Sequence, residues 1–373
     1  MKKWLFLLFV LPLVSMAQQE VTGIIIDKKT KETIPFVNIG VLKKGVGTTS
    51  DESGNFNFMI PKEISQSEIV QISSLGYQTV KIPISQLTNG VDGQSIISMS
   101  PENIVLNEVE VYGNDLVQVS DYIGYRNYSP DNFGYWKDNM ALGAEMATRI
   151  VTDKEKRKLI SLEFEVLANP SDSLLLRVNV YRDGDIPGAN LNGSQKNILH
   201  TLKKHELIVK VDLEPYEIYV SDDFFVSLEL VQQYDKNPVA LVLAASSNNQ
   251  GSYIRYASQD GWEKISDLNM AFYLETALLV TQKEAAKREK RLDKKERELK
   301  MLSGFTIYDR QMISNVNVYN KRTKEMTISD QTGRYQIHAK KNDIIFFTKP
   351  GFENTALKIN DQQFANALMH RAD

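Results

Sequence analysis

The sequence predicts a mainly β protein, built from sandwiches of short strands and one charged helix. Over many short stretches apolar residues alternate with polar ones, which is typical of half-buried strands. A short turn sequence with similar flanks occurs once near each end of the chain. One stretch alone, residues 281–302, has the composition of a long helix. The 373 residues, of which 42% are apolar and 24% charged, are sufficient for two to three globular domains.

The repeated turn has the pattern Asp-x-x-Gly. Asp51 and Asp330 open the two four-residue turns, and Gly54 and Gly333 close them, as type I turns prefer. The aspartate side chain can accept backbone N–H groups of the turn, while glycine adopts a backbone angle that is costly for other residues. Because alternating apolar residues follow, each turn is predicted to join two strands as a hairpin.

The similarity extends beyond the turn on both sides. The matched residues before it are Ile34, Val37, Asn38 and Ile39 in the first copy and Ile313, Val316, Asn317 and Val318 in the second. After it, a glycine–aromatic pair recurs at residues 76–77 and 351–352. Two copies so far apart do not form a solenoid, so we expect two similar β-domains on either side of a different middle.

The residues of the first copy resemble a known family. Residues 23–27, 34–39, 47–51, 54–56 and 75–77 together are similar to the carboxypeptidase-like regulatory domain family. The resemblance covers residues 18–101 and returns in weaker form over residues 303–359. It implies two transthyretin-like β-sandwiches without catalytic residues. In many bacterial TonB-dependent receptors such a domain lies at the N-terminus and ends in a segment similar to residues 106–111 here.

Residues 1–17 have the pattern of a secretory signal. Lys2 and Lys3 precede an apolar core, and Ser15 and Ala17 form a small-x-small cleavage site. The apolar run is about half of the ~20 residues that span a membrane, so we expect cleavage before Gln18 and a mature protein without a transmembrane span. The predicted location is the periplasm or the outer membrane as an associated protein. With zero Cys, the chain contains no disulfide, thiolate metal site or Cys nucleophile.

Residues 141–280 are predicted to form a second, jelly-roll-like β-sandwich. Ile160, Leu162, Phe164 and Val166 alternate with polar residues and are expected on one buried face. Similar alternation recurs over residues 174–180, 207–213, 224–230 and 272–278. Eight or so such strands imply two packed antiparallel sheets.

Residues 102–140 are predicted to be a linker with an aromatic-rich segment. Its candidate glycan platform consists of Tyr122, Tyr125, Tyr128, Tyr135 and Trp136. Aromatic rings stack well on the CH groups of sugars. The alternative, that the rings fill the end of the following sandwich, is favoured because large aromatics occupy cores more often than binding sites.

One loop of the middle domain carries oxygen-bearing side chains at close spacing. Asp183, Asp185, Asn190 and Asn192 could offer four oxygens to Ca²⁺. Their spacing does not match an EF-hand, and the same residue types are common in plain turns. We therefore expect no metal and no cofactor.

Residues 281–302 are predicted to be a charged helical spacer of about 33 Å, at about 1.5 Å per residue. Its acidic residues precede basic ones at i,i+4 spacing, which stabilises an exposed helix. Residues 303–373 are predicted to form the second regulatory-like sandwich with a short tail, in which residues 361–369 form a helical turn or two.

The sequence contains no His-Glu-x-x-His, Gly-x-Ser-x-Gly or phosphate-binding loop motif. The net charge of −3 gives no attraction to nucleic acid. These observations favour an exported, non-catalytic envelope protein that binds a protein or glycan partner. The alternatives are a carbohydrate-binding module centred on the middle domain and an uncharacterised hydrolase.

Overall fold

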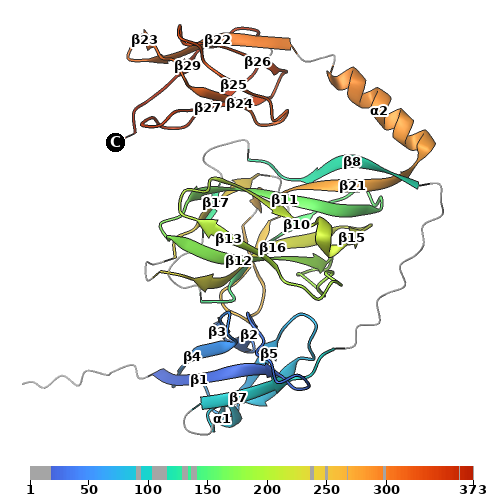
Figure 1. Cartoon of the computed structure of the whole chain (residues 1–373), viewed down its shortest axis with the longest axis vertical. Helices are drawn as coiled ribbons and strands as arrows, with labels where there is room; N and C mark the ends of the chain where they lie inside the picture. Colours follow the sequence, from blue (N-terminus) through green and yellow to red (C-terminus); the bar gives the residue numbers. More distant parts are fainter. Residues whose placement is uncertain are drawn as a thin grey trace, which may run out of the picture. The chain divides into compact units, whose positions relative to one another are not determined.

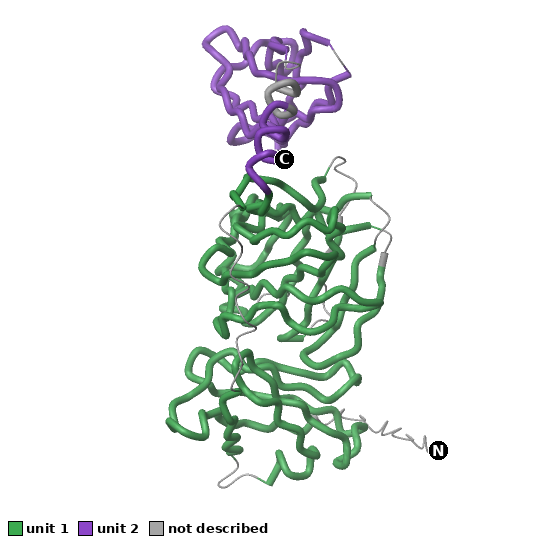
Figure 2. The backbone as a smooth tube through the Cα atoms, turned by 90° about the vertical axis from the view of Figure 1, so that its right-hand side faces the viewer, with its two compact units in different colours: residues 1–280 green, residues 281–373 purple. Residues whose placement is uncertain are grey.

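The computed structural model describes residues 18–89, 94–102, 116–127, 133–135, 141–235, 239–247, 251–266, 268–296, 300–360 and 362–372. Strands dominate it, which confirms the prediction of a mainly β chain. The chain forms two compact units, residues 1–280 and 281–373 (Figure 2). The predicted signal at residues 1–17 and the segment at residues 106–111 lie outside the described residues.

The first sandwich has two sheets (Figure 1). One has the order β4 (Asn55–Pro61), β1 (Gln18–Asp27) and β7 (Gln94–Met99). The other has the order β3 (Val46–Thr49), β2 (Asn38–Val41), β5 (Ile69–Ser73) and β6 (Val80–Pro83), which leads into the short helix α1 (Ile84–Leu87). Alternation builds the core between them: Phe56, Phe58 and Ile60 of β4 are buried.

The middle sandwich has two larger sheets whose strands pair antiparallel wherever their registers are described. The first runs β13 (Ile198–Lys203), β12 (Ser173–Arg182), β16 (Phe224–Gln233), β10 (Glu145–Ile150), β18 (Ser252–Arg255) and β19 (Glu263–Ser266). The second runs β20 (Asn269–Met270), β17 (Val242–Ser246), β11 (Arg157–Ala168), β21 (Tyr273–Thr281) and β8 (Leu116–Gly124). Strands β14 (Ile208–Asp212) and β15 (Tyr219–Val220) also pair with β11, the 3₁₀ turn η1 (Glu214–Tyr216) lies between them, and β9 (Phe133–Tyr135) pairs with β17.

A β-bulge in β11 changes which residues of this strand face the core, so one predicted core position is wrong. The register of β11 against β21 shifts between Leu159 and Ser161. Leu159 is therefore fully buried, whereas Ile160, predicted in the core, is half-buried. After the bulge the predicted alternation holds, and Leu162 and Phe164 are buried. The naming of this sandwich as a jelly roll, and the division of the chain at residues 101, 140 and 280, remain predictions.

Unit 2 begins with the helix α2 (Gln282–Glu296), which is shorter than predicted. Thr281 and Glu284 form a capping box: the Thr281 hydroxyl and N–H contact the Glu284 carboxylate, and the Glu284 N–H donates to Thr281. The expectation of helix up to residue 302 is wrong, because β22 (Lys300–Tyr308) already begins at Lys300. Leu302 is buried in the core there, and this burial with strand pairing outweighs helix propensity.

The sandwich of unit 2 repeats the topology of the first. Its sheets are β26 (Arg334–Ala339), β22 and β29 (Ala367–Leu368), with β23 (Gln311–Met312) at the edge of β22, and β25 (Met326–Ile328), β24 (Asn317–Asn320), β27 (Ile344–Thr348) and β28 (Thr355–Lys358). As β7 does with β1, β29 pairs parallel with β22. The predicted helical turn over residues 361–369 is therefore wrong at residues 367–368, because these two residues form a strand of the sheet.

The repeated turn does not form a hairpin. It joins β3 to β4 in the first sandwich and β25 to β26 in unit 2, and each pair of strands belongs to two different sheets. The turn therefore crosses from one layer of a sandwich to the other. A hydroxyl stabilises the same crossing in both copies: Ser50 donates to the Ile34 carbonyl and Ser329 to the Ile313 carbonyl, both at 3.2 Å.

Candidate functional site

The two Asp-x-x-Gly turns have closely similar geometry. The Asp51 carboxylate accepts the N–H groups of Ser53 and Asn55, both at 2.9 Å, and Gly54 has φ 78°. The Asp330 carboxylate accepts the corresponding N–H groups of residues 332 and 334 at 2.8 and 3.0 Å, and Gly333 has φ 76°. Hydrogen bonds, first the one from the Thr332 hydroxyl, lower the pKa of Asp330. The two carboxylates thus bind backbone N–H groups of their own turns.

The candidate glycan platform is only partly accessible. Tyr125 is 7% exposed, lies in the core of the middle sandwich and donates its hydroxyl to the Arg149 carbonyl at 2.8 Å. The position of Tyr125 therefore fits the alternative interpretation, in which the aromatic rings fill the end of the sandwich. Tyr128 and Trp136 lie outside the described residues, as does the side chain of Tyr135.

Of the two members of the predicted set whose side chains the structure describes, Tyr122 is the accessible one, with 51% of its surface exposed. Its ring stacks on Tyr273 with 5.5 Å between centroids and 7° between planes. The Arg126 guanidinium lies 3.6 Å from the Tyr273 centroid. The two rings come from the neighbouring strands β8 and β21, and Tyr122 is the more exposed of the two.

The candidate metal loop uses its oxygens internally. Arg149 donates to both carboxylate oxygens of Asp183, at 2.7 and 2.5 Å. The Asn190 amide oxygen accepts the Asn192 N–H at 2.8 Å, and the Asn192 amide oxygen accepts from Ser194. Among the contacts described for this loop, none links the Asp185 side chain to Asp183, Asn190 or Asn192. Within the described part of the chain, no three His, Cys, Asp or Glu side chains are grouped to hold a metal ion.

The structure assigns a role to a feature that the sequence analysis missed, the outer face of the sheet β3-β2-β5. Gly40 and Gly47 are paired on β2 and β3. The backbone of Ser258, from the middle sandwich, lies directly on them: a Cβ on Gly47 would lie 2.7 Å from the Ser258 carbonyl oxygen, and one on Gly40 would overlap it. Facing glycines inside strands mark a close approach of another backbone, and this was the available signal.

Polar contacts extend this interface between the two sandwiches. The Gln259 amide accepts from Gln71 at 2.6 Å and donates to Ser73 at 2.7 Å. Thr49 donates to the Val231 carbonyl, and Tyr234 donates to Glu52 at 2.9 Å. The outward-facing residues of β2 thus contact the middle sandwich or face its backbone. The same is true of their partners on β3 and β5.

A buried ionic network lies behind the interface on the sheet of β12, β16, β10 and β18. Arg177 pairs with Glu229 at 3.1 Å and also donates to the Phe36 carbonyl and the Asn38 amide oxygen of the first sandwich, both at 3.1 Å. Glu229 is 1% exposed and Arg177 4%. The network lies on the face of this sheet opposite the apolar core, and it connects that face to the first sandwich.

The second carboxylate of the network, Glu145, is fully buried. It pairs with Arg255 and accepts hydrogen bonds from Asn179 at 2.9 Å, from Tyr181 at 2.8 Å and from Ser227. Burial, with the nearby Glu145 charge, holds the pKa of Tyr181 well above its usual range. Burial alone would lower the pKa of Arg255, but the Glu145 charge raises it. Two carboxylates on facing positions of neighbouring strands suggest acid–base chemistry, yet each is paired with an arginine.

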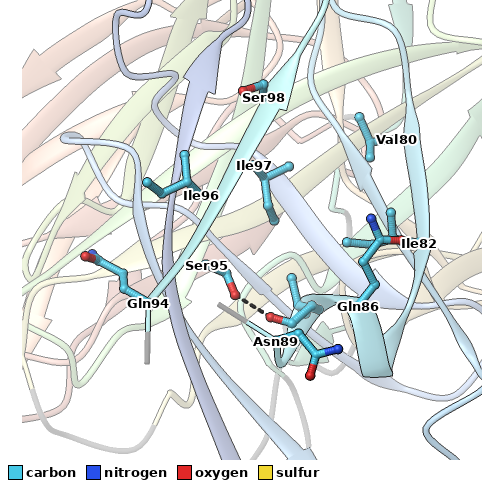
Figure 3. A pocket seen from close by; sticks show the side chains of 10 residues that line it. Val80, Ile82, Gln86, Asn89, Gln94, Ser95, Ile96, Ile97 and Ser98 are labelled. Carbon is cyan, nitrogen blue, oxygen red and sulfur yellow. Dashed lines mark hydrogen bonds between the residues drawn. The ribbon is translucent and has the colours of Figure 1, made fainter. Parts of the chain in front are cut away.

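Two grooves open on the first sandwich. Figure 3 shows one of about 360 Å³ between β7, β6 and α1, where the Ser95 hydroxyl donates to the Leu87 carbonyl. Its lining contains no titratable side chain, and Ile96 is 67% exposed. The other, of about 480 Å³, lies beside the interface and has Asp51 as its one charged lining residue. Neither offers the convergent acid, base or nucleophile that catalysis requires.

Comparison with known proteins agrees with this description of the first sandwich. Residues 21–111 match the CarboxypepD_reg-like domain family, which confirms the resemblance predicted from the sequence. Over 121 residues the chain is 31% identical to TonB-dependent receptor P3 of Formosa agariphila. This stretch is 32% of the chain and 11% of the receptor, so the chain corresponds to a small part of that protein.

The solved structures that are similar to this chain are similar only weakly. BcpA, the major pilin subunit of Bacillus cereus, aligns over 95% of this chain and 100% of its own, with 9% identity and a TM-score of 0.16. The T6 backbone pilin of serotype M6 Streptococcus pyogenes aligns over 93% and 81%, with 9% identity and a TM-score of 0.14. TM-scores this low carry no argument about fold or function. In the described part of the chain, no helix has the length and apolar character needed to cross a membrane.

Proposed function

We propose that this chain is an exported, non-catalytic protein of the bacterial envelope, whose β-sandwich modules bind a protein or glycan partner. The observation that carries the proposal is the interface in unit 1, where the CarboxypepD_reg-like domain uses one sheet face to hold another folded domain. A domain that recognises a folded surface in this way is a binding module. The relation to part of a TonB-dependent receptor supports an envelope location.

The chemistry of the described residues supports binding over catalysis. The buried carboxylates Glu145 and Glu229 are both paired with arginines, and neither lines one of the two grooves described above. An uncharacterised hydrolase would need a free acid or base in an open pocket. A carbohydrate-binding function for the middle sandwich is favoured by one observation, the exposed Tyr122 stacked on Tyr273.

The test is recovery of the tagged full-length protein from the envelope of its own cells, followed by mass spectrometry of proteins and glycans that co-purify. A glycan array with the same protein separates the two partner classes, and Tyr122→Ala should abolish any glycan binding through the aromatic pair. Hydrolysis of envelope polysaccharides or peptides by the purified chain would overturn the proposal.

A further inference from the structure

The outer face of the sheet β25-β24-β27 in unit 2 corresponds to the interface face of the first sandwich. The strand registers establish this: Asn38 pairs with Thr49 and Ser73, and Asn317 pairs with Ile328 and Thr348. The residues that face outward in unit 1 therefore have direct counterparts in unit 2. In unit 1 this face is covered by a β-sandwich.

The chemistry of the two faces differs. In unit 1 the outward residues are small or polar, namely Gly40, Gly47, Thr49 and Gln71. Their counterparts in unit 2 are large and apolar, namely Tyr319, Met326, Ile328 and Phe346. We name these four residues the apolar face. Met326 is 68% and Ile328 58% exposed, and contiguous apolar residues at a surface mark interaction sites.

Basic side chains border the apolar face. The ammonium of the exposed Lys324 lies 5.8 Å from the Tyr319 ring centroid. The Lys321 ammonium lies 5.4 Å from the Phe346 centroid, but Lys321 is only 3% exposed and lies beneath the surface. Lys358, on the neighbouring strand β28, is exposed. In residues 300–373 basic side chains outnumber acidic ones. A complementary surface would be apolar at its centre and acidic at its edge.

We propose that the apolar face docks a partner protein whose contact surface is apolar at its centre and acidic at its edge. This inference rests on the proposed function and names the surface of unit 2 that performs it. Contact with a second copy of this chain would place two basic edges against each other. An anionic membrane would require apolar groups that insert below the headgroups, whereas Tyr319 and Phe346 lie half-buried in the sheet.

The experiment places a photoreactive benzoylphenylalanine at position 326 or 328 of the full chain in its own cells. Position 336 on β26, exposed on the other sheet, is the matched control. We expect one discrete cross-link to another polypeptide from 326 and 328 and none from 336.

The cross-linked protein, identified and purified, should bind the wild-type chain. Ile328→Asp and Lys324→Glu should each weaken this binding at least tenfold, added salt should weaken it, and Lys341→Glu, in the exposed loop after β26, should leave it unchanged.

Four results would overturn the proposal: cross-links to a second copy, cross-links to lipid, no cross-link from 326 and 328, or a partner whose binding is insensitive to Ile328→Asp. Circular dichroism melts of the variants exclude misfolding, because both substituted side chains are already exposed. If co-purification still recovers a partner while the apolar face gives no cross-link, only this surface is rejected and the binding function stands.

Discussion

The backbone carbonyl of Ser258 occupies the space that a side chain on Gly40 would need. Gly40 has no positive φ that would require glycine, so its role is to admit another backbone. The same contact includes Gly47 on the paired strand. The first two sandwiches can thus approach this closely because Gly40 and Gly47 have no side chains on the sheet surface.

Gly40→Val should therefore separate the first sandwich from the middle one without unfolding either. Overpacking of this kind costs about 1–3 kcal/mol. We expect faster hydrogen exchange at residues 71–73 and 258–259, measured by mass spectrometry on the full chain. Gly261→Val, three residues from Ser258 and with no atom near its Cβ position, is the matched control and should show wild-type exchange. Unchanged exchange in Gly40→Val would show that the interface tolerates a side chain there.

The turn glycines give a prediction that separates the two units. Gly54→Val and Gly333→Val each place a β-branched residue at a φ near 77° and against neighbouring backbone, at a cost of about 1–3 kcal/mol. Gly54→Val should destabilise unit 1 alone, and Gly333→Val unit 2 alone. Limited proteolysis with mass spectrometry identifies which unit is cleaved. Equal protection in both variants and the wild type would contradict a structural role for these glycines.

Asp343 gives unit 2 a dependence on pH. Burial would raise its pKa, but hydrogen bonds, first from Arg322 and then from Asn320, outweigh burial and lower it. A folded-state pKa below the unfolded value means that the stabilisation is complete above about pH 4 and is lost as the pH falls through the folded pKa. Asp343→Asn should destabilise the chain at pH 7, and its difference from wild type should shrink towards pH 3. Urea unfolding followed by circular dichroism measures both; a difference that is constant with pH would contradict the prediction.

The two repeated sandwiches could be predicted from the sequence because the patterns that indicate them are local. Alternation, the Asp-x-x-Gly turn and the glycine–aromatic pair each depend on neighbours along the chain. What it could not provide is how one surface meets another. In the first copy Tyr77 donates to Asp27 at 3.1 Å, and in the second the corresponding residues, Phe352 and Tyr308, pack edge to face at 5.3 Å. The two copies thus have different residues at both positions, and each copy makes a contact there with its own chemistry.

Two other differences have physical causes of the same kind. The bulge at Ile160 changes the face of a strand without interrupting its apolar alternation. The helix ends early because Leu302 gains burial in a sheet, and this depends on a strand more than thirty residues away. The burial of Tyr125 in the core agrees with the favoured interpretation, in which the aromatic rings fill the end of the sandwich. Among the described side chains of the candidate glycan platform, Tyr122 is the exposed one.

The predicted signal at residues 1–17 leads to a direct measurement. N-terminal sequencing of the protein from a periplasmic or outer-membrane fraction should begin at Gln18, because the small residues Ser15 and Ala17 fit the cleavage site. Ala17→Leu should block cleavage and retain the apolar segment. Recovery of the wild-type protein with Met1 intact would reject both the cleavage and the export prediction.

The buried pair of Arg177 and Glu229 should dominate the strength of the interface. Arg177→Met leaves Glu229 without its cation and removes the donors to Phe36 and Asn38, so it should cost about 3–5 kcal/mol. Gln259→Ala removes two neutral hydrogen bonds and should cost about 1–3 kcal/mol.

The double variant Arg177→Met with Glu229→Met removes the stranded charge. It should therefore be more stable than Arg177→Met alone, although one more side chain has been changed. Urea unfolding of the four proteins, with hydrogen exchange at residues 36–38 as the local measurement, provides the comparison. If Arg177→Met is no less stable than Gln259→Ala, the ionic network contributes little and the glycine contact with Ser258 holds the two sandwiches together.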